Sequence, residues 1–340
     1  MFVTLSVIVM ALLAVLVCVL AVSGIAALAG ASFRKFFLRG LWALLLPPLV
    51  FLYGMAVGRN ECKVSEVEVS DPRLPEQFDG YRVVQISDLH LESVRGREHF
   101  LSSVVEKINS LEPDLILFTG DLVTSHPDEL LGFEPVLSSL TAADGVFSVL
   151  GNHDYCIYRH WEADSLRAEA VRTLVERETA LGWKVLMNES VNIYRDSVSV
   201  GDSSAVISVA GVENISQTSY FPSYGDLDKA MTGVRGSFTI LMTHDPTHWH
   251  KAVAEYPDIA LTLSGHTHAM QLSILGWSPS RYLFKEYRGL YRKQVTTGDG
   301  TLENALLYVN IGLGETSLPS RVGTPPEITL FTLRHASASH

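Results

Sequence analysis

Acidic residues are absent before Glu61, and the whole chain of 340 residues has only three cysteines. Three cysteines are too few for the disulfide scaffold of a small secreted domain. Positive charge is also absent before Arg34, and no charge lies between Gly40 and Gly58. Because a membrane-spanning helix needs about 20 apolar residues, each of these uncharged runs is long enough to cross a bilayer.

Basic residues are scarce in the rest of the chain. From Glu61 onward there are 22 basic and 37 acidic residues, which give a net charge of −15. Such a domain lacks the clustered Lys and Arg that contact phosphates, so nucleic acid is excluded as a partner. Apolar residues make up 47% of the chain, which excludes disorder for most of it. An anionic substrate would need a local positive centre, such as a bound metal.

The two uncharged runs predict a helical hairpin in the cell membrane, with helices over about residues 3–31 and 41–58 of an anchor that covers residues 1–60. No basic segment precedes the first run, which is also longer than the apolar core of a cleaved signal peptide. Two buried core helices are the alternative, but no other part of the chain is apolar enough to surround them. Pro47 and Pro48 should kink the second helix.

The loop between the two predicted helices sets the expected orientation. It contains Arg34, Lys35 and Arg39 without an acidic residue, and such loops favour the cytoplasm. We therefore expect a two-helix membrane protein whose globular domain, residues 61–334, is extracytoplasmic and is followed by a tail over residues 335–340. The opposite orientation stays open, and nothing in the sequence sets the oligomeric state.

The globular domain alternates between short β-rich runs and helical stretches in its first half. Strands are expected over 81–87, 114–119 and 146–150, with helices over 100–109, 128–140 and 161–181. Strands dominate the second half, over 184–187, 191–194, 206–210, 238–242, 259–263, 306–309 and 328–333, and residues 196–204 read as a hairpin and loop. This pattern predicts an α/β fold with parallel strands and a mixed or second sheet.

Polar side chains follow five of the predicted strands. The motifs are DLH (88–90), GD (120–121), GNHD (151–154), THD (243–245) and GHTH (265–268). Sites in α/β sheets assemble at the carboxyl ends of strands. Carboxylate and imidazole ligands without thiolates suit Mn, Fe or Zn. Two neighbouring ions need a bridging carboxylate, for which Asp121 is the natural candidate, and glycines at 120, 151 and 265 let the backbone approach closely.

The ordered set of motifs resembles the calcineurin-like metallophosphoesterase superfamily, and within it the membrane-linked bacterial phosphodiesterases of the YkuE/YaeI type. The resemblance covers about residues 64–333 and includes the later motifs YVNIGLG, LPSR and PPEIT. It implies a four-layer α/β/β/α sandwich and a metal-dependent phosphoric ester hydrolase. The implied cofactors are two divalent metal ions, with Mn²⁺ preferred and Zn²⁺ or Fe²⁺ as alternatives.

The resemblance also implies roles for individual residues. The implied metal ligands are Asp88, His90 and His268 for one ion, Asn152, His244 and His266 for the other, and Asp121 for both. His153 would stabilise or protonate the leaving oxygen, and Asp154 would orient His153 or anchor its turn. Many relatives carry an acid a few residues after the GD pair. Thr124 stands there in this chain, which leaves the support of His153 open.

Residues 281–293, RYLFKEYRGLYRK, combine five basic and four aromatic residues. Arg281, Lys285 and Arg288 are candidates for binding a substrate phosphate, and the segment could also lie against anionic headgroups. The plainer interpretation is a loop whose aromatic rings pack on the sheet while its charges are solvated.

The function favoured by these patterns is a membrane-bound phosphodiesterase acting on a lipid-linked or envelope phosphoester. One alternative is a pyrophosphatase acting on a nucleotide–lipid precursor of the UDP-diacylglucosamine type, which would need a cytoplasmic active site. Another is a catalytically silent membrane scaffold, which the complete ligand set disfavours.

Overall fold

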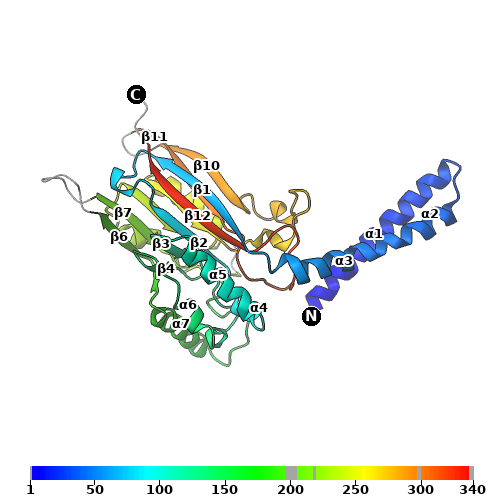
Figure 1. Ribbon diagram of the computed structural model, residues 1–340, viewed down its shortest axis with the longest axis horizontal. Coiled ribbons are helices and arrows are strands. Elements are labelled where there is room, and N and C mark those ends of the chain that lie inside the picture. Colours follow the sequence, from blue (N-terminus) through cyan, green and yellow to red (C-terminus); the bar gives the residue numbers. More distant parts are fainter. Residues whose placement is uncertain (1, 196–204, 217–219, 297–299, 337–340) are drawn as a thin grey trace.

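Two long helices project as a rod from one end of a domain with two β-sheets (Figure 1). This computed structural model describes residues 2–195, 205–216, 220–296 and 300–336. The hairpin and loop expected over 196–204 lie outside the described residues.

The rod consists of α1 (Phe2–Leu28) and a second continuous helix. The second helix passes through α2 (Phe33–Gly40), a 3₁₀ stretch (Leu41–Leu45), α3 (Leu46–Tyr53) and a π-helical turn (Gly54–Gly58). Thr4–Leu28 and Phe33–Gly58 are long and apolar enough to cross a membrane. The predicted start at residue 41 is therefore wrong, because the basic residues form the first two turns of the helix instead of a loop.

The prolines of the second helix coincide with a local change in helix geometry. Pro47 and Pro48 lie in the first turn of α3, directly after the 3₁₀ stretch. Proline has no backbone N–H and clashes with the preceding turn, so the regular α-helical hydrogen bonding is interrupted there.

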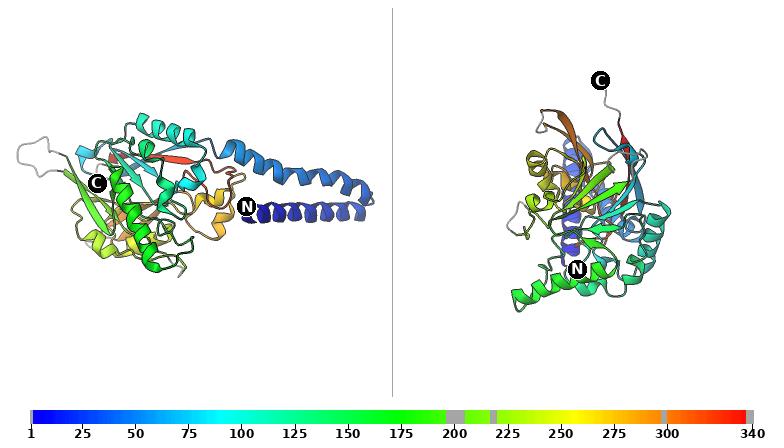
Figure 2. Two further views of the ribbon diagram at one scale, coloured as in Figure 1. Left: turned by 90° about the horizontal axis from the view of Figure 1, so that it is seen from below. Right: turned by 90° about the vertical axis from the view of Figure 1, so that its left-hand side faces the viewer.

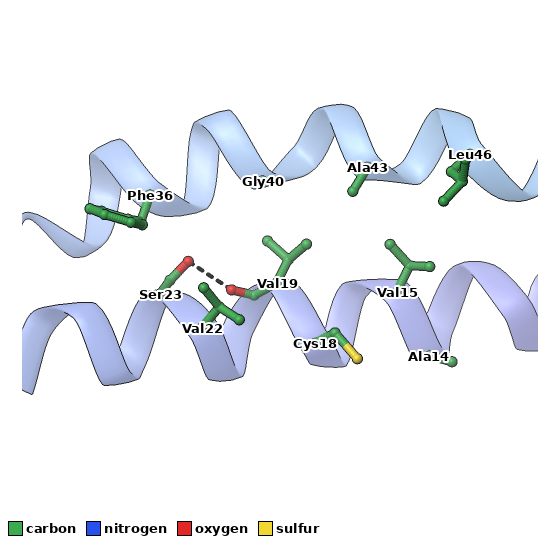
Figure 3. A pocket seen from close by; sticks show the side chains of 10 residues that line it. All are labelled: Ala14, Val15, Cys18, Val19, Val22, Ser23, Phe36, Gly40, Ala43 and Leu46. Carbon is green, nitrogen blue, oxygen red and sulfur yellow. Dashed lines mark hydrogen bonds between the residues drawn. The ribbon is translucent and has the colours of Figure 1, made fainter.

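The two helices pack closely where Gly40 faces Val19 (Figure 3). A Cβ atom on Gly40 would lie 2.6 Å from Cγ1 of Val19, so only glycine fits without a shift. The hydroxyl of Ser23 donates to the carbonyl oxygen of Val19 at 2.7 Å. Small residues at the contact and an internally satisfied hydroxyl are typical of helices that pair in a membrane.

The first sheet has six strands in the order β1-β12-β2-β3-β4-β5. The strands from β2 to β5 are parallel, β12 is antiparallel to β2, and β1 pairs only with β12, in parallel. Their bounds are β1 (Lys63–Asp71), β2 (Arg82–Ile86), β3 (Leu115–Phe118), β4 (Val146–Ser148), β5 (Lys184–Val185) and β12 (Glu327–His335).

The second sheet also has six strands, in the order β10-β11-β9-β8-β7-β6. Its four central strands are parallel, and the two edge strands are antiparallel to their neighbours. The bounds are β6 (Glu189–Arg195), β7 (Ala205–Gly211), β8 (Phe238–Met242), β9 (Ile259–Ser264), β10 (Gly289–Thr296) and β11 (Leu302–Val309).

The central strands are buried on both faces. In β2, Val83 packs into the core between the two sheets, whereas Val84 packs into the core beneath the helices. In β8, Ile240 faces the first sheet and Leu241 faces the opposite helical layer. Since successive side chains of a strand alternate between faces, three cores separate four layers. The predicted four-layer α/β/β/α sandwich is confirmed.

The helices cover the outer faces of the sheets (Figures 1 and 2). The helices on the first sheet are α4 (Leu91–Val94), α5 (Glu98–Ser110), α6 (Glu134–Leu137) and α7 (Asp164–Ala180). Those on the second sheet are α8 (Leu227–Met231) and α9 (Trp249–Glu255). Short 3₁₀ turns occur at Glu76–Phe78, Pro127–Leu130, Pro246–His248, His268–Gln271 and Pro279–Tyr282.

Most predicted elements of the domain are present, with shifted ends. The helix predicted over 128–140 is wrong, because Gly132 adopts φ 91° and separates the short turn Pro127–Leu130 from α6. Strands β1 and β10 were not predicted. Both alternate polar and apolar residues at the edge of a sheet, so neither forms an apolar run.

Candidate metal centre

The predicted site residues come from loops that follow five parallel strands. Asp88 and His90 follow β2, and Asp121 follows β3. The GNHD motif follows β4, and the remaining histidines follow β8 and β9. The structure brings all seven predicted metal ligands to one place at the carboxyl ends of both sheets. This is the position at which sites of α/β sheets form.

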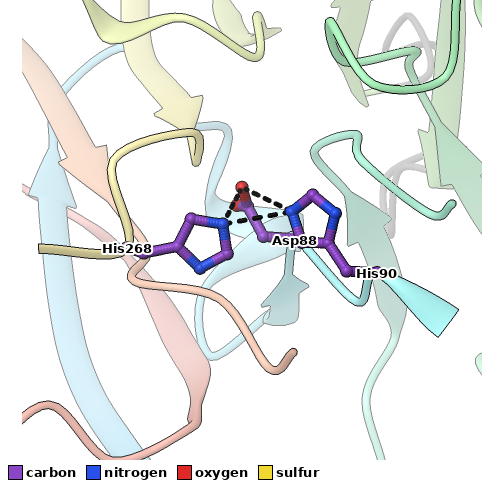
Figure 4. A group of neighbouring side chains, drawn as sticks. All are labelled: Asp88, His90 and His268. Atoms are coloured by element: carbon purple, nitrogen blue, oxygen red, sulfur yellow. Dashed lines mark hydrogen bonds and ion pairs between the residues drawn. The ribbon is translucent and has the colours of Figure 1, made fainter. Parts of the chain in front are cut away.

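The first cluster contains Asp88, His90 and His268 (Figure 4). The Nε2 atom of His268 lies 3.3 Å from Oδ1 of Asp88. The Nε2 atoms of His90 and His268 are 3.1 Å apart, and all three residues are buried. Three ligand atoms therefore converge on one point in the interior.

The second cluster contains Asp121, Asn152, His244 and His266. Oδ2 of Asp121 lies 3.1 Å from Nε2 of His244. Nδ1 of His266 lies 3.3 Å from the same nitrogen and 2.8 Å from Oδ1 of Asn152. Oδ2 of Asp121 is also 3.7 Å from Nε2 of His90, so this carboxylate stands between the clusters.

The chain enters the left-handed region at five of these residues. Their φ angles lie between 43° and 73°, at Asp88, His90, Asp121, His266 and His268. A left-handed conformation costs a non-glycine residue about 1–2 kcal/mol. Such strain persists only where surrounding structure enforces it, and it is typical of functional sites.

Hydrogen bonds between the loops enforce this backbone. The backbone nitrogen of Asp88 donates to the carbonyl of Gly120 at 2.9 Å, and that of His90 donates to the carbonyl of Asp121 at 3.1 Å. A Cβ atom on Gly120 would lie 2.8 Å from Nδ1 of His244. Glycine at this position therefore allows the loops after β3 and β8 to meet.

Most histidines of the centre are neutral. Burial lowers the pKa of His90 and His268 well below the usual value. Burial also lowers the pKa of His266 to about 4. These rings are neutral at pH 7, and neutral imidazole is the ligand form. Burial raises the pKa of Asp88 to about 7.

Asp121 and His244 behave as a charged pair. Burial alone would raise the pKa of Asp121, but His244 and His153 hold it well below its usual range. Burial alone would lower the pKa of His244, but the carboxylate of Asp121 raises it to about 10. Nδ1 of His244 donates to the carbonyl of Thr119 at 2.7 Å, so the second proton of the charged ring lies on Nε2, where it faces Asp121.

The chemistry of the donor set fits two divalent cations. Each cluster offers carboxylate oxygens and imidazole nitrogens, and among the described residues no cysteine belongs to either cluster. In both clusters the ligand atoms of neighbouring residues converge to within 3.1–3.3 Å of one another, so one cation could contact several of them. Nitrogen and oxygen ligands of this kind suit Mn, Fe or Zn.

His153 lies beside the clusters and is partly exposed. Its ring is edge-on to His90, with centroids 4.7 Å apart, and its Nδ1 donates to the carbonyl of Thr124 at 2.7 Å. The backbone of Thr124 thus supplies the support whose source was open in the sequence. A ring nitrogen of His153 also lies within 4.8 Å of ligand atoms of His90 and Asp121, so the ring borders both clusters.

Asp154 anchors the turn. Its buried carboxylate accepts hydrogen bonds from the backbone nitrogens of Asp121 at 2.7 Å, Val123 at 3.1 Å and Gly151 at 2.9 Å. These bonds tie the loop after β4 to the loop after β3. Of the two roles expected for Asp154, the geometry favours anchoring of the turn over orientation of His153.

Two residues that shape the site were not found from the sequence. The carboxylate of Glu129 accepts from the backbone nitrogens of Thr124 at 2.6 Å and Ser125 at 2.8 Å, and so fixes the carbonyl that holds His153. The hydroxyl of Tyr158 accepts from Nδ2 of Asn152 at 3.0 Å. Of the two, Glu129 had a sequence signal, because it lies three residues after the N-cap residue His126 in a capping-box pattern.

A buried arginine was also missed. Arg321 is fully buried, and its guanidinium donates to the carbonyls of Ile311 at 3.0 Å and Thr324 at 3.0 Å, as well as to that of Gly314. It also lies 3.2 Å from Nδ1 of His268. The LPSR motif contains this residue, but nothing in the motif indicates contact with a metal ligand.

The predicted substrate-binding residues do not reach the clusters. Arg281 lies over the ring of Tyr282 at 5.9 Å. Lys285 lies 3.9 Å from Glu286, and Arg288 donates to Ser273 at 3.5 Å. From the same segment, the ring of Phe284 meets a metal-centre residue, edge-on to His266 with centroids 5.5 Å apart.

Comparisons with known proteins agree with this geometry. The chain is 31% identical to the "Transmembrane protein with metallophosphoesterase domain" of Danio rerio over 91% of this chain and 65% of that protein. It is 31% identical to the metallophosphoesterase YkuE of Bacillus subtilis over 88% of this chain and 97% of that protein. It is 29% identical to the UDP-2,3-diacylglucosamine pyrophosphatase LpxG of Chlamydia trachomatis over 85% of this chain and 94% of that protein.

The chain thus spans slightly less than two thirds of the zebrafish relative and nearly all of the two bacterial ones. The sequence profile described as Calcineurin-like phosphoesterase matches residues 81–270, which run from the start of β2 to the last predicted metal ligand and beyond. With this match and the two clusters in place, the chain belongs to the calcineurin-like phosphoesterase family.

Proposed function

We propose that this protein is a membrane-anchored phosphodiesterase that uses two divalent metal ions to hydrolyse a lipid-linked or envelope phosphodiester. The observation that carries the proposal is the position of Asp121, whose carboxylate stands between two separate clusters of nitrogen and oxygen ligands. Two ions that share a carboxylate suit in-line displacement at phosphorus.

The chemistry divides between the bound ions and the protein. When bound, two divalent cations supply Lewis acidity to the phosphoryl oxygens and activate a water. Protonated His153 can donate from Nε2 to the leaving oxygen while Nδ1 stays on the carbonyl of Thr124. Glu129 and Asp154 hold the two loops that set the position of this ring.

We also propose a division of the chain into an anchor and a catalytic domain. Residues 1–60 form the membrane anchor, residues 61–334 form the phosphoesterase domain, and a short tail follows. The basic residues Arg34, Lys35 and Arg39 lie at the end of the hairpin remote from the domain (Figure 1). The preference of basic residues for the cytoplasm then places the domain on the extracytoplasmic side.

The second candidate is a pyrophosphatase acting on a nucleotide–lipid precursor. Its support is the similarity to the chlamydial proteins named UDP-2,3-diacylglucosamine pyrophosphatase. This activity would need the domain in the cytoplasm. Labelling a cysteine introduced at Lys229, on the exposed surface of α8, with a membrane-impermeant maleimide in intact cells would separate the two candidates.

The activity is tested with detergent-solubilised full-length protein after removal of metal by a chelator and addition of Mn²⁺, Zn²⁺ or Fe²⁺. Bis-p-nitrophenyl phosphate and p-nitrophenyl phosphate are compared as substrates. We expect metal-dependent cleavage of the diester, fastest with Mn²⁺. Cleavage of neither ester by protein that binds two ions would contradict the proposal and favour a silent scaffold.

A further inference from the structure

The loop between β9 and β10 exposes large apolar side chains close to the metal centre. Five of these side chains, which we call the apolar surface, are Ile274, Leu275, Trp277, Tyr282 and Leu283. Their exposed fractions run from 42% for Trp277 to complete exposure for Leu275. A contiguous exposed apolar patch on a folded domain marks an interaction site.

Backbone hydrogen bonds and ring packing fix the conformation of the apolar surface. The backbones of Ile274 and Trp277 bond to each other in both directions, at 2.8 and 3.0 Å, and close a tight turn. Leu275 stands at the tip of this turn with φ 50°, where glycine or asparagine is the usual residue. Tyr282 lies beside Trp277, with ring centroids 6.3 Å apart.

A linking segment, residues 315–322, connects this loop to the membrane anchor. The backbone nitrogen of Ser273 donates to the carbonyl of Val322 at 2.7 Å. On the other side, the hydroxyl of Ser320 donates to the carbonyl of Phe51 in α3 at 3.3 Å. The loop and the second apolar helix are therefore held against the same short stretch of chain.

Both helices of the anchor reach the linking segment. The hydroxyl of Thr4 donates to the carbonyl of Ser317 at 3.3 Å, and Arg59 forms an ion pair with Glu315 at 2.9 Å. Two views show the yellow-to-orange loops after β9 on the side of the domain from which the helices project (Figures 1 and 2).

The length of the anchor sets the depth of this region. The span Thr4–Leu28 has 25 residues, which at about 1.5 Å per residue make a helix of about 37 Å. The hydrocarbon core of a bilayer is about 30 Å thick. The domain-side turn of α1 therefore lies at the membrane surface, and so do the linking segment and the loop that it holds.

The charges around the apolar surface match a membrane surface. Arg281 and Lys285 flank it and are exposed. Aromatic, aliphatic and basic residues on one surface are typical of segments that lie at the headgroup level of anionic membranes. Directly behind them, Phe284 packs on His266 of the second cluster.

We propose that the apolar surface is embedded in the headgroup region of the bilayer that the hairpin spans, so that the metal centre opens at the membrane surface. The scissile phosphodiester then belongs to a lipid resident in that bilayer, and this part of the inference rests on the proposed function. The position of the loop is independent of catalysis and can be measured without it.

The position is tested by fluorescence quenching on full-length protein in nanodiscs of phosphatidylcholine and phosphatidylglycerol. Leu275→Cys is labelled with an environment-sensitive dye in a Cys18→Ala, Cys62→Ser background. Cys156 stays, since it is buried and its thiol pKa is raised to about 12. The matched control is Leu302→Cys, which replaces an exposed leucine at the start of β11. This position lies far from the anchor, because the carbonyl of nearby Asn304 accepts a hydrogen bond from Arg73, which follows the end of β1 opposite the anchor.

We expect lipids spin-labelled near the headgroup to quench the dye at position 275 at least several-fold more strongly than at 302, and aqueous iodide to show the reverse order. Equal quenching by lipid at both positions would overturn the proposal. Protection of position 275 from both quenchers would also overturn it, because it would indicate a protein contact in place of lipid.

The catalytic consequence is tested with Leu275→Glu/Leu283→Glu against the control Leu302→Glu. We expect the double variant to cleave a fluorescent phosphodiester lipid in vesicles at least tenfold more slowly than wild type, with unchanged cleavage of bis-p-nitrophenyl phosphate. An equal rate on the vesicle substrate would overturn a role in lipid access. If wild type cleaves neither substrate, the proposed function fails, while the quenching result still decides where the loop lies.

Discussion

The two halves of the metal centre use the same kinds of side chain but are supported differently. In the second cluster, Nδ1 of His244 donates to the carbonyl of Thr119, so its Nε2 becomes a free ligand atom once a proton leaves. In the first cluster, Nδ1 of His268 faces the guanidinium of Arg321, which can only donate. The neutral ring of His268 therefore carries its proton on Nε2, the atom nearest Asp88.

This difference shows that identical ligand types can be prepared for metal in two ways. In the second cluster, His244 becomes a ligand by deprotonation alone. The first cluster needs the proton of His268 to move, together with its contact to Arg321. Residues around the ligands, and not the ligands themselves, distinguish the two halves, as is common in metal sites.

Asp121→Asn removes the carboxylate that belongs to both halves and should have the largest effect. We expect a loss of diesterase activity on the order of a thousandfold, because charge stabilisation at both ions is weakened. Rate assays and metal analysis on the same preparation measure it, with thermal melting as the control for folding. Wild-type activity in a folded Asp121→Asn protein would refute the shared position of this residue.

Single-cluster variants should separate the halves. His266→Ala and His268→Ala are each expected to retain one bound ion of two and to lose activity by about two orders of magnitude, the effect of removing one stabilising group. Metal content by mass spectrometry after gel filtration provides the measurement. If either variant lost both ions, the clusters would have to be treated as one cooperative site.

The pH dependence of metal affinity sharpens the comparison. The pKa of His244 is raised to about 10, so its Nε2 proton must be displaced when the second cluster binds metal at pH 7. Between pH 7 and 9 we expect affinity at this cluster to rise about tenfold per pH unit, as for one linked proton. Titration calorimetry on His268→Ala, which keeps only the second cluster, measures this slope.

The same raised pKa affects the metal-free protein in the opposite direction. Its stabilising contribution is complete below about pH 6.5, the unperturbed value for histidine, and is lost as pH rises through about 10. Melting curves of metal-free protein should therefore show falling stability over this range. A melting temperature that rose over the same range would contradict the assignment of the charged pair.

Tyr158→Phe should produce the smallest effect and only in the second cluster. Without the hydroxyl, Nδ2 of Asn152 loses its acceptor, so its ligand oxygen is less well oriented. Loss of such a supporting bond weakens metal binding by about tenfold. Tyr220→Phe is the matched control, because the ring of Tyr220 lies near Tyr158 but no bond to a ligand is removed. An equal loss of metal affinity in both variants would contradict the orienting role of Tyr158.

The place where the ligands gather could be predicted from the sequence because the carboxyl ends of parallel strands meet at one edge. Asp88, Asp121 and His244 each follow an apolar run, so the pattern locates them without knowledge of packing. The left-handed backbone of the same residues could not be predicted. It arises from bonds between loops that are distant in sequence, such as the one between His266 and Asp88.

The supporting residues could not be predicted for a related reason. Glu129 acts through backbone nitrogens, and Arg321 acts through backbone carbonyls of its own loop between β11 and β12. No side-chain motif records such contacts. The edge strands β1 and β10 were missed because their amphipathic patterns carry much less apolar signal than the buried central strands.

The pairing of β1 with β12 has a consequence for biosynthesis. Among the described residues, the first strand after the anchor pairs with the last strand of the domain alone, and four residues separate the linking segment from that strand. A ribosome must therefore release almost the whole chain before β1 can be added to its sheet, while the hairpin enters the bilayer far earlier. We therefore expect the hairpin to insert before the domain is complete, and the linking segment and β12 to be the last parts to join anchor and domain.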